Sequence, residues 1–139
     1  MDEYPRQYLY RRVVRAKLFI DTHFPSQIDL DNIAEEACFS KFHFIRLFKE
    51  IYGKTPHQHL TDVRVANAKE MLAGGATVAA ACFGVGFDSI SSFTGLFRRR
   101  VGVTPAAFQR AAIERLQEMN ARPIKFVPNC FAEMRGWKK

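Results

Sequence analysis

One block of this sequence occurs twice. The segment FIRLFKEIYGKTP, residues 44–56, returns as FTGLFRRRVGVTP, residues 93–105. The shared residues stand at matching places: Phe44/Phe93, Leu47/Leu96, Phe48/Phe97, Gly53/Gly102, Thr55/Thr104 and Pro56/Pro105. The same spacing of apolar and helix-ending residues dictates the same local structure, so the chain is expected to build one small unit twice.

The first copy reads as two short amphipathic helices. Its apolar residues recur every three or four positions, as Leu30, Ile33, Ala34 and Ala37 and then as Phe44, Leu47, Phe48 and Ile51. Asp29 and Ser40 stand where helix N-caps are needed, and Gly53 ends the second helix. The pattern predicts a short helix, a tight turn and a second helix over about 41–52.

The second copy repeats this pattern with one extra residue before its last helix. Its apolar positions are Val78, Ala81, Cys82 and Val85, followed by Phe93, Leu96, Phe97 and Val101. Thr77 and Asp88 are the predicted N-caps, and the second helix is predicted over about 89–101. The repeat is therefore a duplicated helix-turn-helix.

Three further helices complete the predicted fold. Apolar spacing indicates one over 8–23, with Phe19 widening its buried stripe. Thr-Pro pairs start a connecting helix from Pro56 to about Leu72 and a final helix from Pro105 to about Met119. The fold class is all-α, with about seven helices and two helix-turn-helix units joined by the connecting helix. We expect a first lobe with the connecting helix at 1–75 and a second lobe at 76–121.

The tail, residues 122–139, differs from the rest. Pro123 and Pro128 forbid a continuous helix, and residues 124–127 are predicted to be a short extended segment. Its aromatic residues predict that it packs against something, either an apolar groove on the last helix or a partner such as RNA polymerase.

Composition narrows the partner. The formal net charge is +7 and the pI about 9.6, which favours a polyanion such as nucleic acid. The chain opens Met-Asp-Glu, unlike a secretory signal, and its longest weakly polar run is too short for a bilayer. Three cysteines without a close pair argue against a disulfide framework. We expect a cytoplasmic protein without membrane contact, cofactor or metal.

The repeated motifs resemble those of the AraC/XylS family of bacterial transcription regulators, in its DNA-binding domain. The residues that carry the resemblance are DLDNIAEEACFSKFHFIRLFKEIYGKTPHQHL, VRVANAKEML and VAAACFGVGFDSISSFTGLFRRRVGVTPAAFQR, within residues 8–112. The resemblance implies two recognition helices in successive major grooves of double-stranded DNA. It also implies transcription activation through RNA polymerase. Most members carry a separate sensor or dimerisation domain, for which this chain has no room. It therefore resembles the short members, which implies a monomer on DNA, and the alternative is that the chain is a fragment.

Candidate DNA contacts follow for the first recognition helix. Family members commonly use the positions of Phe42, Ile45 and Arg46 for DNA contact. Arg46 is the expected base reader because its guanidinium pairs with guanine O6 and N7, and the other two suit thymine methyl groups. Extra core packing is the alternative for Phe42 and Ile45. The predicted phosphate contacts are Lys41, His43 and Lys49, and for His43 a surface histidine without a DNA contact is the alternative.

The second recognition helix departs from the family. The position that matches Arg46 is Gly95, which offers no side-chain donor. The predicted reading face is Ile90, Ser91, Ser92, Thr94 and Gly95, with weaker base specificity than the first. Arg98 and Arg99, with Arg100 after them, are expected to contact phosphates, which positions the protein without reading sequence. A solvated helix end is the alternative for these arginines.

Other roles stay open at this point. Arg64 either braces the two halves or meets a phosphate. His57 and His59 are expected at the surface or at a cap and not as metal ligands. Cys38 and Cys82 are expected in the core, which leaves Cys130 for an alternative as an alkyl acceptor in DNA repair. We expect no enzyme. A further alternative is a protein-interaction module on the same scaffold.

Overall fold

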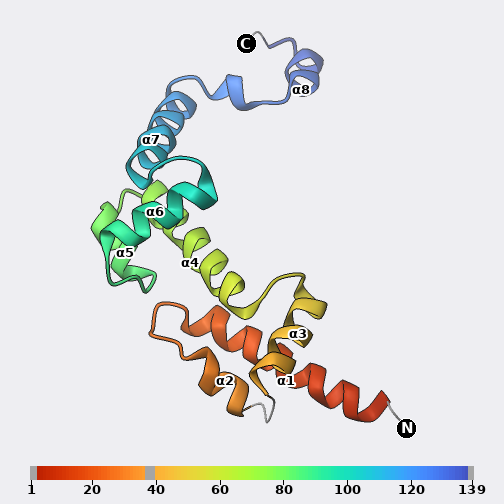
Figure 1. Cartoon of the computed structure of the whole chain (residues 1–139). Coiled ribbons are helices and arrows are strands. Elements are labelled where there is room, and N and C mark those ends of the chain that lie inside the picture. Colours follow the sequence, from red (N-terminus) through yellow and green to blue (C-terminus); the bar gives the residue numbers. More distant parts are fainter. Residues whose placement is uncertain (1–2, 37–39, 138–139) are drawn as a thin grey trace.

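The computed structural model describes residues 3–36 and 40–137, and these are helical without a strand (Figure 1). The elements, in chain order, are α1 (Glu3–His23), α2 (Leu30–Glu36), α3 (Lys41–Tyr52), α4 (Pro56–Ala73), α5 (Val78–Gly84), α6 (Ile90–Val101), α7 (Pro105–Ala121), the 3₁₀ turn η1 (Pro123–Phe126) and α8 (Asn129–Met134). The predicted all-α fold is confirmed. The helix predicted over 8–23 begins earlier, and Ala37 and Cys38 lie outside the described residues.

Two separate hydrophobic cores hold these helices. The first core consists of Val13, Ala16, Ile20, Ala34, Phe44, Leu47, Phe48 and Leu60. The second core consists of Val65, Ala68, Leu72, Ala81, Cys82, Val85, Phe93 and Phe97. Helix α4 contributes to both, and the partly buried Phe24 packs against both. The two helix-turn-helix units therefore have their own interiors and share one helix.

The repeated phenylalanines are the centre of each core. Phe44 and Phe48 are buried in the first, with ring centroids 6.0 Å apart. Phe93 and Phe97 are buried in the second, with centroids 5.6 Å apart. Such tilted aromatic pairs add to the free energy gained by burying their area. Two predicted core positions are wrong: Ile51 and Phe19 are exposed, and the Phe19 ring stacks on His23.

Hydroxyl caps start most of the helices after α2. The side chains of Ser40, Thr55, Thr77 and Thr104 each accept a hydrogen bond from the backbone N–H of the third residue ahead, as predicted. Thr55 forms a capping box with Gln58. The predicted Asp88 cap is wrong, because Ser89 accepts the N–H of Ser92 and α6 begins one residue later.

The tail does not form the predicted extended segment. Residues 123–126 make the 3₁₀ turn η1, which contacts α7, and a short helix α8 follows. Lys125 pairs with Glu118 at 2.8 Å, and the Arg115 guanidinium lies over the Phe126 ring. Proline at the first position of η1 breaks the helix after α7 but is compatible with a tight turn of its own.

Candidate nucleic-acid interface

Helix α3 presents a large, mixed face to solvent. Its buried side is fixed by Phe44 and Phe48, so the residues between them point away from the first core. Phe42 is 82% exposed, and Arg46 and Lys49 are exposed on the same helix. The exposed ring and these cations lie on one helix, so this face offers apolar and cationic groups to a partner.

The remaining candidates on α3 are less free. Ile45 is half-buried and packs against the first core, so only part of its side chain reaches solvent. The Lys41 ammonium pairs with the Asp31 carboxylate of α2 at 3.0 Å, in an exposed position. The backbone N–H of His43 donates to the Ser40 cap, and the imidazole is exposed.

Helix α6 presents small side chains from the corresponding face. Phe93 and Phe97 fix its buried side, which leaves Ile90, Ser91 and Ser92 exposed. Thr94 and Gly95 are half-buried. This surface offers hydroxyl groups and one aliphatic side chain, and it has no counterpart to the large cationic side chain of Arg46 on α3. Both Arg46 and Ser91 are exposed, so neither is covered by other described residues.

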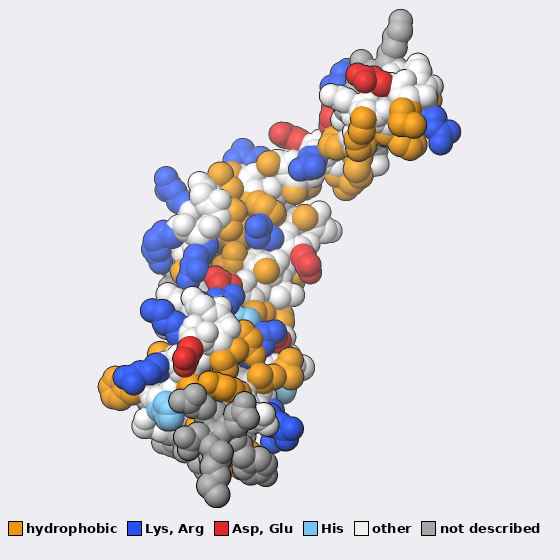
Figure 2. Space-filling model, turned by 90° about the vertical axis from the view of Figure 1, so that its right-hand side faces the viewer, with side chains coloured by type: hydrophobic (Ala, Val, Ile, Leu, Met, Phe, Trp, Pro, Cys, Tyr) orange, Lys and Arg blue, Asp and Glu red, His pale blue; other side chains and the backbone are white. Residues whose placement is uncertain are grey.

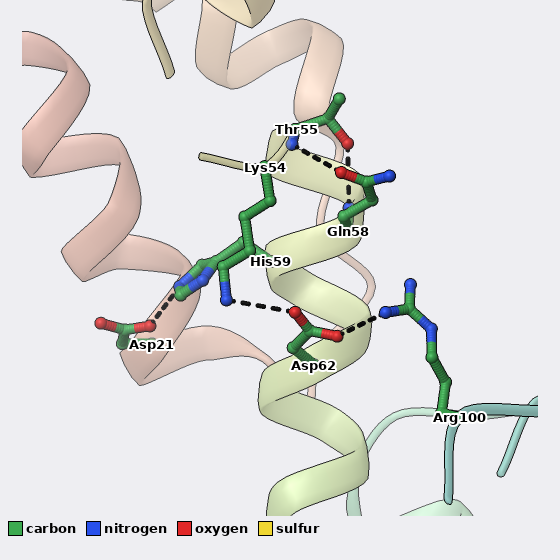
Figure 3. Close-up of polar contacts among 7 residues, drawn as sticks. All are labelled: Asp21, Lys54, Thr55, Gln58, His59, Asp62 and Arg100. Atoms are coloured by element: carbon green, nitrogen blue, oxygen red, sulfur yellow. Dashed lines mark hydrogen bonds and ion pairs between the residues drawn. The ribbon is translucent and has the colours of Figure 1, made fainter. Parts of the chain in front are cut away.

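The three arginines that end α6 divide into two kinds. Arg98 and Arg99 are exposed. Arg100 is exposed as well, but it donates from Nη1 to Oδ1 of Asp62 on α4, at 2.7 Å (Figure 3). Sequence analysis missed this pair, because no pattern around Asp62 marks a partner on another helix.

Cationic side chains gather along one edge of the molecule. Figure 2 shows Lys and Arg along the left-hand edge of that view, over much of its height. In Figure 1 the helices α3 and α6 lie at opposite ends of α4. A distributed row of cations suits the regular phosphate spacing of a nucleic acid better than a single small anion.

Arg64 braces the two halves. Its Nε donates to the Phe24 carbonyl at 2.9 Å and its Nη2 to the Ser26 carbonyl at 3.0 Å, both after α1. Its guanidinium lies 5.7 Å from the Phe87 ring, which packs on the second core. Burial lowers the pKa of Arg64 from its ordinary value. Of the two roles left open by the sequence, the structure shows the brace.

Gly86 lies close to the backbone segment that Arg64 holds, and only glycine fits there. Gly86 has a φ of +101°, and a Cβ there would stand 2.8 Å from the Phe24 carbonyl oxygen. Any side chain would therefore clash with the backbone that Arg64 holds and would also be strained by the positive φ.

His59 is a buried residue, so the expectation of a surface histidine is wrong. Its Nε2 lies 2.6 Å from Oδ1 of Asp21 on α1 (Figure 3). Its ring centroid lies 5.7 Å from that of Phe48. Burial acts to raise the pKa of Asp21, but hydrogen bonds from Lys17 and His59 outweigh it and hold that pKa below its ordinary value. The cluster ties α1 to α4 and forms no metal site: the described residues contain no group of three or more potential metal ligands.

The family assignment follows from comparison. Residues 33–111, more than half of the chain, match the family model described as a helix-turn-helix domain. The chain belongs to the AraC/XylS family of transcription regulators. Its duplicated units are the DNA-binding domain of such a regulator.

Relatives of known sequence agree with this assignment. The chain is 30% identical over 93 residues to the MmsAB operon regulatory protein of Pseudomonas aeruginosa. The aligned residues cover 66% of this chain and 30% of that protein. The chain is also 30% identical over 93 residues to the bifunctional transcriptional activator/DNA repair enzyme AdaA of Bacillus subtilis, covering 66% and 44%. The chain thus spans less than half the length of these relatives.

A solved structure has the same fold. The DNA-binding domain of AdpA, a global transcriptional factor, in complex with a target DNA superimposes with a TM-score of 0.67 at 28% identity. The superposition covers 80% of this chain and 96% of the AdpA domain.

Two cysteines in the described residues, Cys82 and Cys130, lie in different environments. Cys82 is buried, as predicted, and burial raises the pKa of its thiol, whereas Cys130 is exposed on α8. Exposure alone does not make a thiol a nucleophile, because the reactive form is a stabilised thiolate.

Within the described part of the chain, no helix combines the length and apolar character that crossing a bilayer requires.

Proposed function

We propose that α3 and α6 enter successive major grooves on one side of a DNA duplex. The observation that carries this proposal is their placement at opposite ends of one unbroken helix, α4, of 18 residues. At a rise of 1.5 Å per residue such a helix is about 27 Å long. Successive major grooves on one face of B-DNA are about 34 Å apart, so a rod of this length suits them.

In this proposal the first unit reads the sequence. Arg46 donates to a guanine edge, and the exposed Phe42 ring and the free part of Ile45 pack against thymine methyl groups. Lys41, His43 and Lys49 contact flanking phosphates. The support is their position on the exposed face of α3, with Phe44 and Phe48 anchoring the opposite face.

The second unit contributes mainly phosphate contacts and little base specificity. Ile90, Ser91, Ser92 and Thr94 meet base edges with small side chains that discriminate weakly. Arg98 and Arg99 contact phosphates from the last turn of α6. We propose that 1–75 and 76–121 act as two DNA-binding lobes that share α4, with 122–139 appended.

We further propose that the chain binds as a monomer and activates transcription by touching RNA polymerase. An asymmetric pair of recognition helices on one chain needs no second copy to span two grooves. Selection of bound fragments from a random duplex pool tests the DNA proposal. It should return a bipartite motif with one sharp and one blurred half, about one helical turn apart. Two equally sharp halves would contradict the division of roles.

One observation favours a second candidate function. A ring as exposed as that of Phe42 also suits a protein partner, so the scaffold could serve as a protein-interaction module. Binding to random duplex DNA at about 50 mM salt discriminates, because phosphate contacts are strong at low salt and weaken steeply as salt rises. Salt-dependent binding supports the DNA proposal, and its absence supports the interaction module.

A further inference from the structure

One carboxylate connects the ends of both recognition helices. Asp62 lies on α4, and its Oδ2 is 3.1 Å from the ammonium of Lys54, just after α3 (Figure 3). Its Oδ1 is 2.7 Å from Nη1 of Arg100, in the last turn of α6. A single side chain on the connecting helix therefore contacts the C-terminal end of α3 and the C-terminal end of α6.

We propose that Asp62 is a positioning residue that fixes the two recognition helices relative to each other and so sets the half-site spacing accepted on DNA. This inference rests on the proposed DNA binding. It assigns Arg100 to the clamp, although its neighbours Arg98 and Arg99 face solvent. Asp62 touches no DNA in this proposal and acts through the placement of α3 and α6.

The exposure of the three groups argues for a role in orientation. Their side chains are 34–38% exposed, and ion pairs of that kind contribute little to the free energy of unfolding. The two cores share no fully buried residue, so a small rotation about α4 disturbs few apolar contacts. A weak clamp can then bias the orientation even though it adds little to overall stability.

A second brace makes the clamp more effective. Arg64 stands two positions after Asp62 on α4, so the two side chains leave the helix on different sides. Arg64 holds the segment after α1 near Gly86, and Asp62 holds the ends of α3 and α6. Restraints on two sides of one helix limit rotation that either alone would permit.

The test measures how affinity for DNA depends on the spacing between the two half-sites. A residue that only stabilises the fold would not change this dependence. The duplex selected by the wild type is remade with one base pair removed or added between its halves. Each base pair shifts the second half by about 3.4 Å and turns it by about a tenth of a helical turn. The wild type should lose about tenfold in affinity on either altered duplex, in the range of a mismatched base pair.

The Asp62→Asn variant should lose less than about threefold on the same altered duplexes, because its lobes adjust to the new spacing. Glu70→Gln is the matched control: Glu70 is exposed on the same helix, and its replacement raises the net charge by the same amount. That control should keep the wild-type spacing preference. An equal flattening of the spacing preference in both variants would overturn the inference, because the change in net charge alone would then explain it.

Arg100→Gln tests the clamp from its other end. It should flatten the spacing preference as Asp62→Asn does, and the double variant should be no flatter than either single variant. If Asp62→Asn fails to fold, Arg100→Gln alone decides. A wild-type spacing preference in the folded variants overturns the inference and leaves DNA binding intact, whereas a wild type that binds no duplex overturns the proposed function itself.

Discussion

Helices α3 and α6 are each anchored by a buried pair of phenylalanines, Phe44 and Phe48 in α3 and Phe93 and Phe97 in α6, yet their outer surfaces differ in chemistry. On α3 the outer face carries Phe42 and Arg46, which are large and reach far from the helix. On α6 the matching face carries hydroxyl groups and Gly95, and its cations are confined to the last turn. A duplicated scaffold can therefore keep its core while the side chains on its two outer faces diverge.

The largest effect is expected when one buried phenylalanine is removed from each core. Phe48→Ala and Phe97→Ala should each lower the free energy of unfolding by about 3–5 kcal/mol, because both rings are fully buried. If the units are divided as proposed, Phe48→Ala should abolish protection of the sharp half-site in footprinting first. Phe97→Ala should first loosen the blurred half. Equal loss of both halves in both variants would show that the units do not act separately.

Removing the proposed base reader gives the next effect in size. Arg46→Ala should weaken binding to the selected duplex by about 1–3 kcal/mol and relax the preference at one base position. Arg110→Ala, an exposed arginine of α7, is the control for loss of charge. Competition binding with duplexes altered at single positions measures both. An unchanged preference at every position would refute the role of Arg46.

Removing an arginine from the last turn of α6 should cause a smaller loss of DNA affinity that does not depend on the DNA sequence. Arg98→Ala should weaken binding by about fivefold at 0.15 M salt, and by the same factor on every sequence, because one phosphate contact is lost. The slope of log affinity against log salt should become shallower by about one unit. Titrations of selected and random duplexes at several salt concentrations measure this. A loss confined to the selected duplex would mean that Arg98 reads bases.

The smallest effect concerns Gly95, which marks the difference between the two reading faces. A Cβ added there would meet only the end of Arg99, at 3.6 Å, so alanine fits. Gly95→Ala should raise the free energy of unfolding by about 0.5–1 kcal/mol, because glycine is unfavourable inside a helix. Thermal melting measures the gain. The motif selected by this variant should match that of the wild type, and a newly sharp second half would contradict the assigned role of α6.

Much of the fold could be predicted because helix signals are local. Apolar spacing, hydroxyl caps and the glycines after α3 and α6 each act within a few residues, so they can be read directly from the chain. The shift from Asp88 to Ser89 shows the limit of such reading, since two adjacent residues can both accept the same kind of hydrogen bond. In the tail, proline correctly predicted a break but did not specify the turn that follows.

The duplicated units, their buried phenylalanines and the contrast between Arg46 and Gly95 follow from the amino-acid order alone, because each depends on side-chain type and spacing along one helix. The contacts of Arg64, His59 and Arg100 emerge once the helices have packed. Their partners lie 38 to 40 residues away along the chain. Such contacts exist only after the helices have packed, and local spacing carries no information about which distant groups that packing brings together.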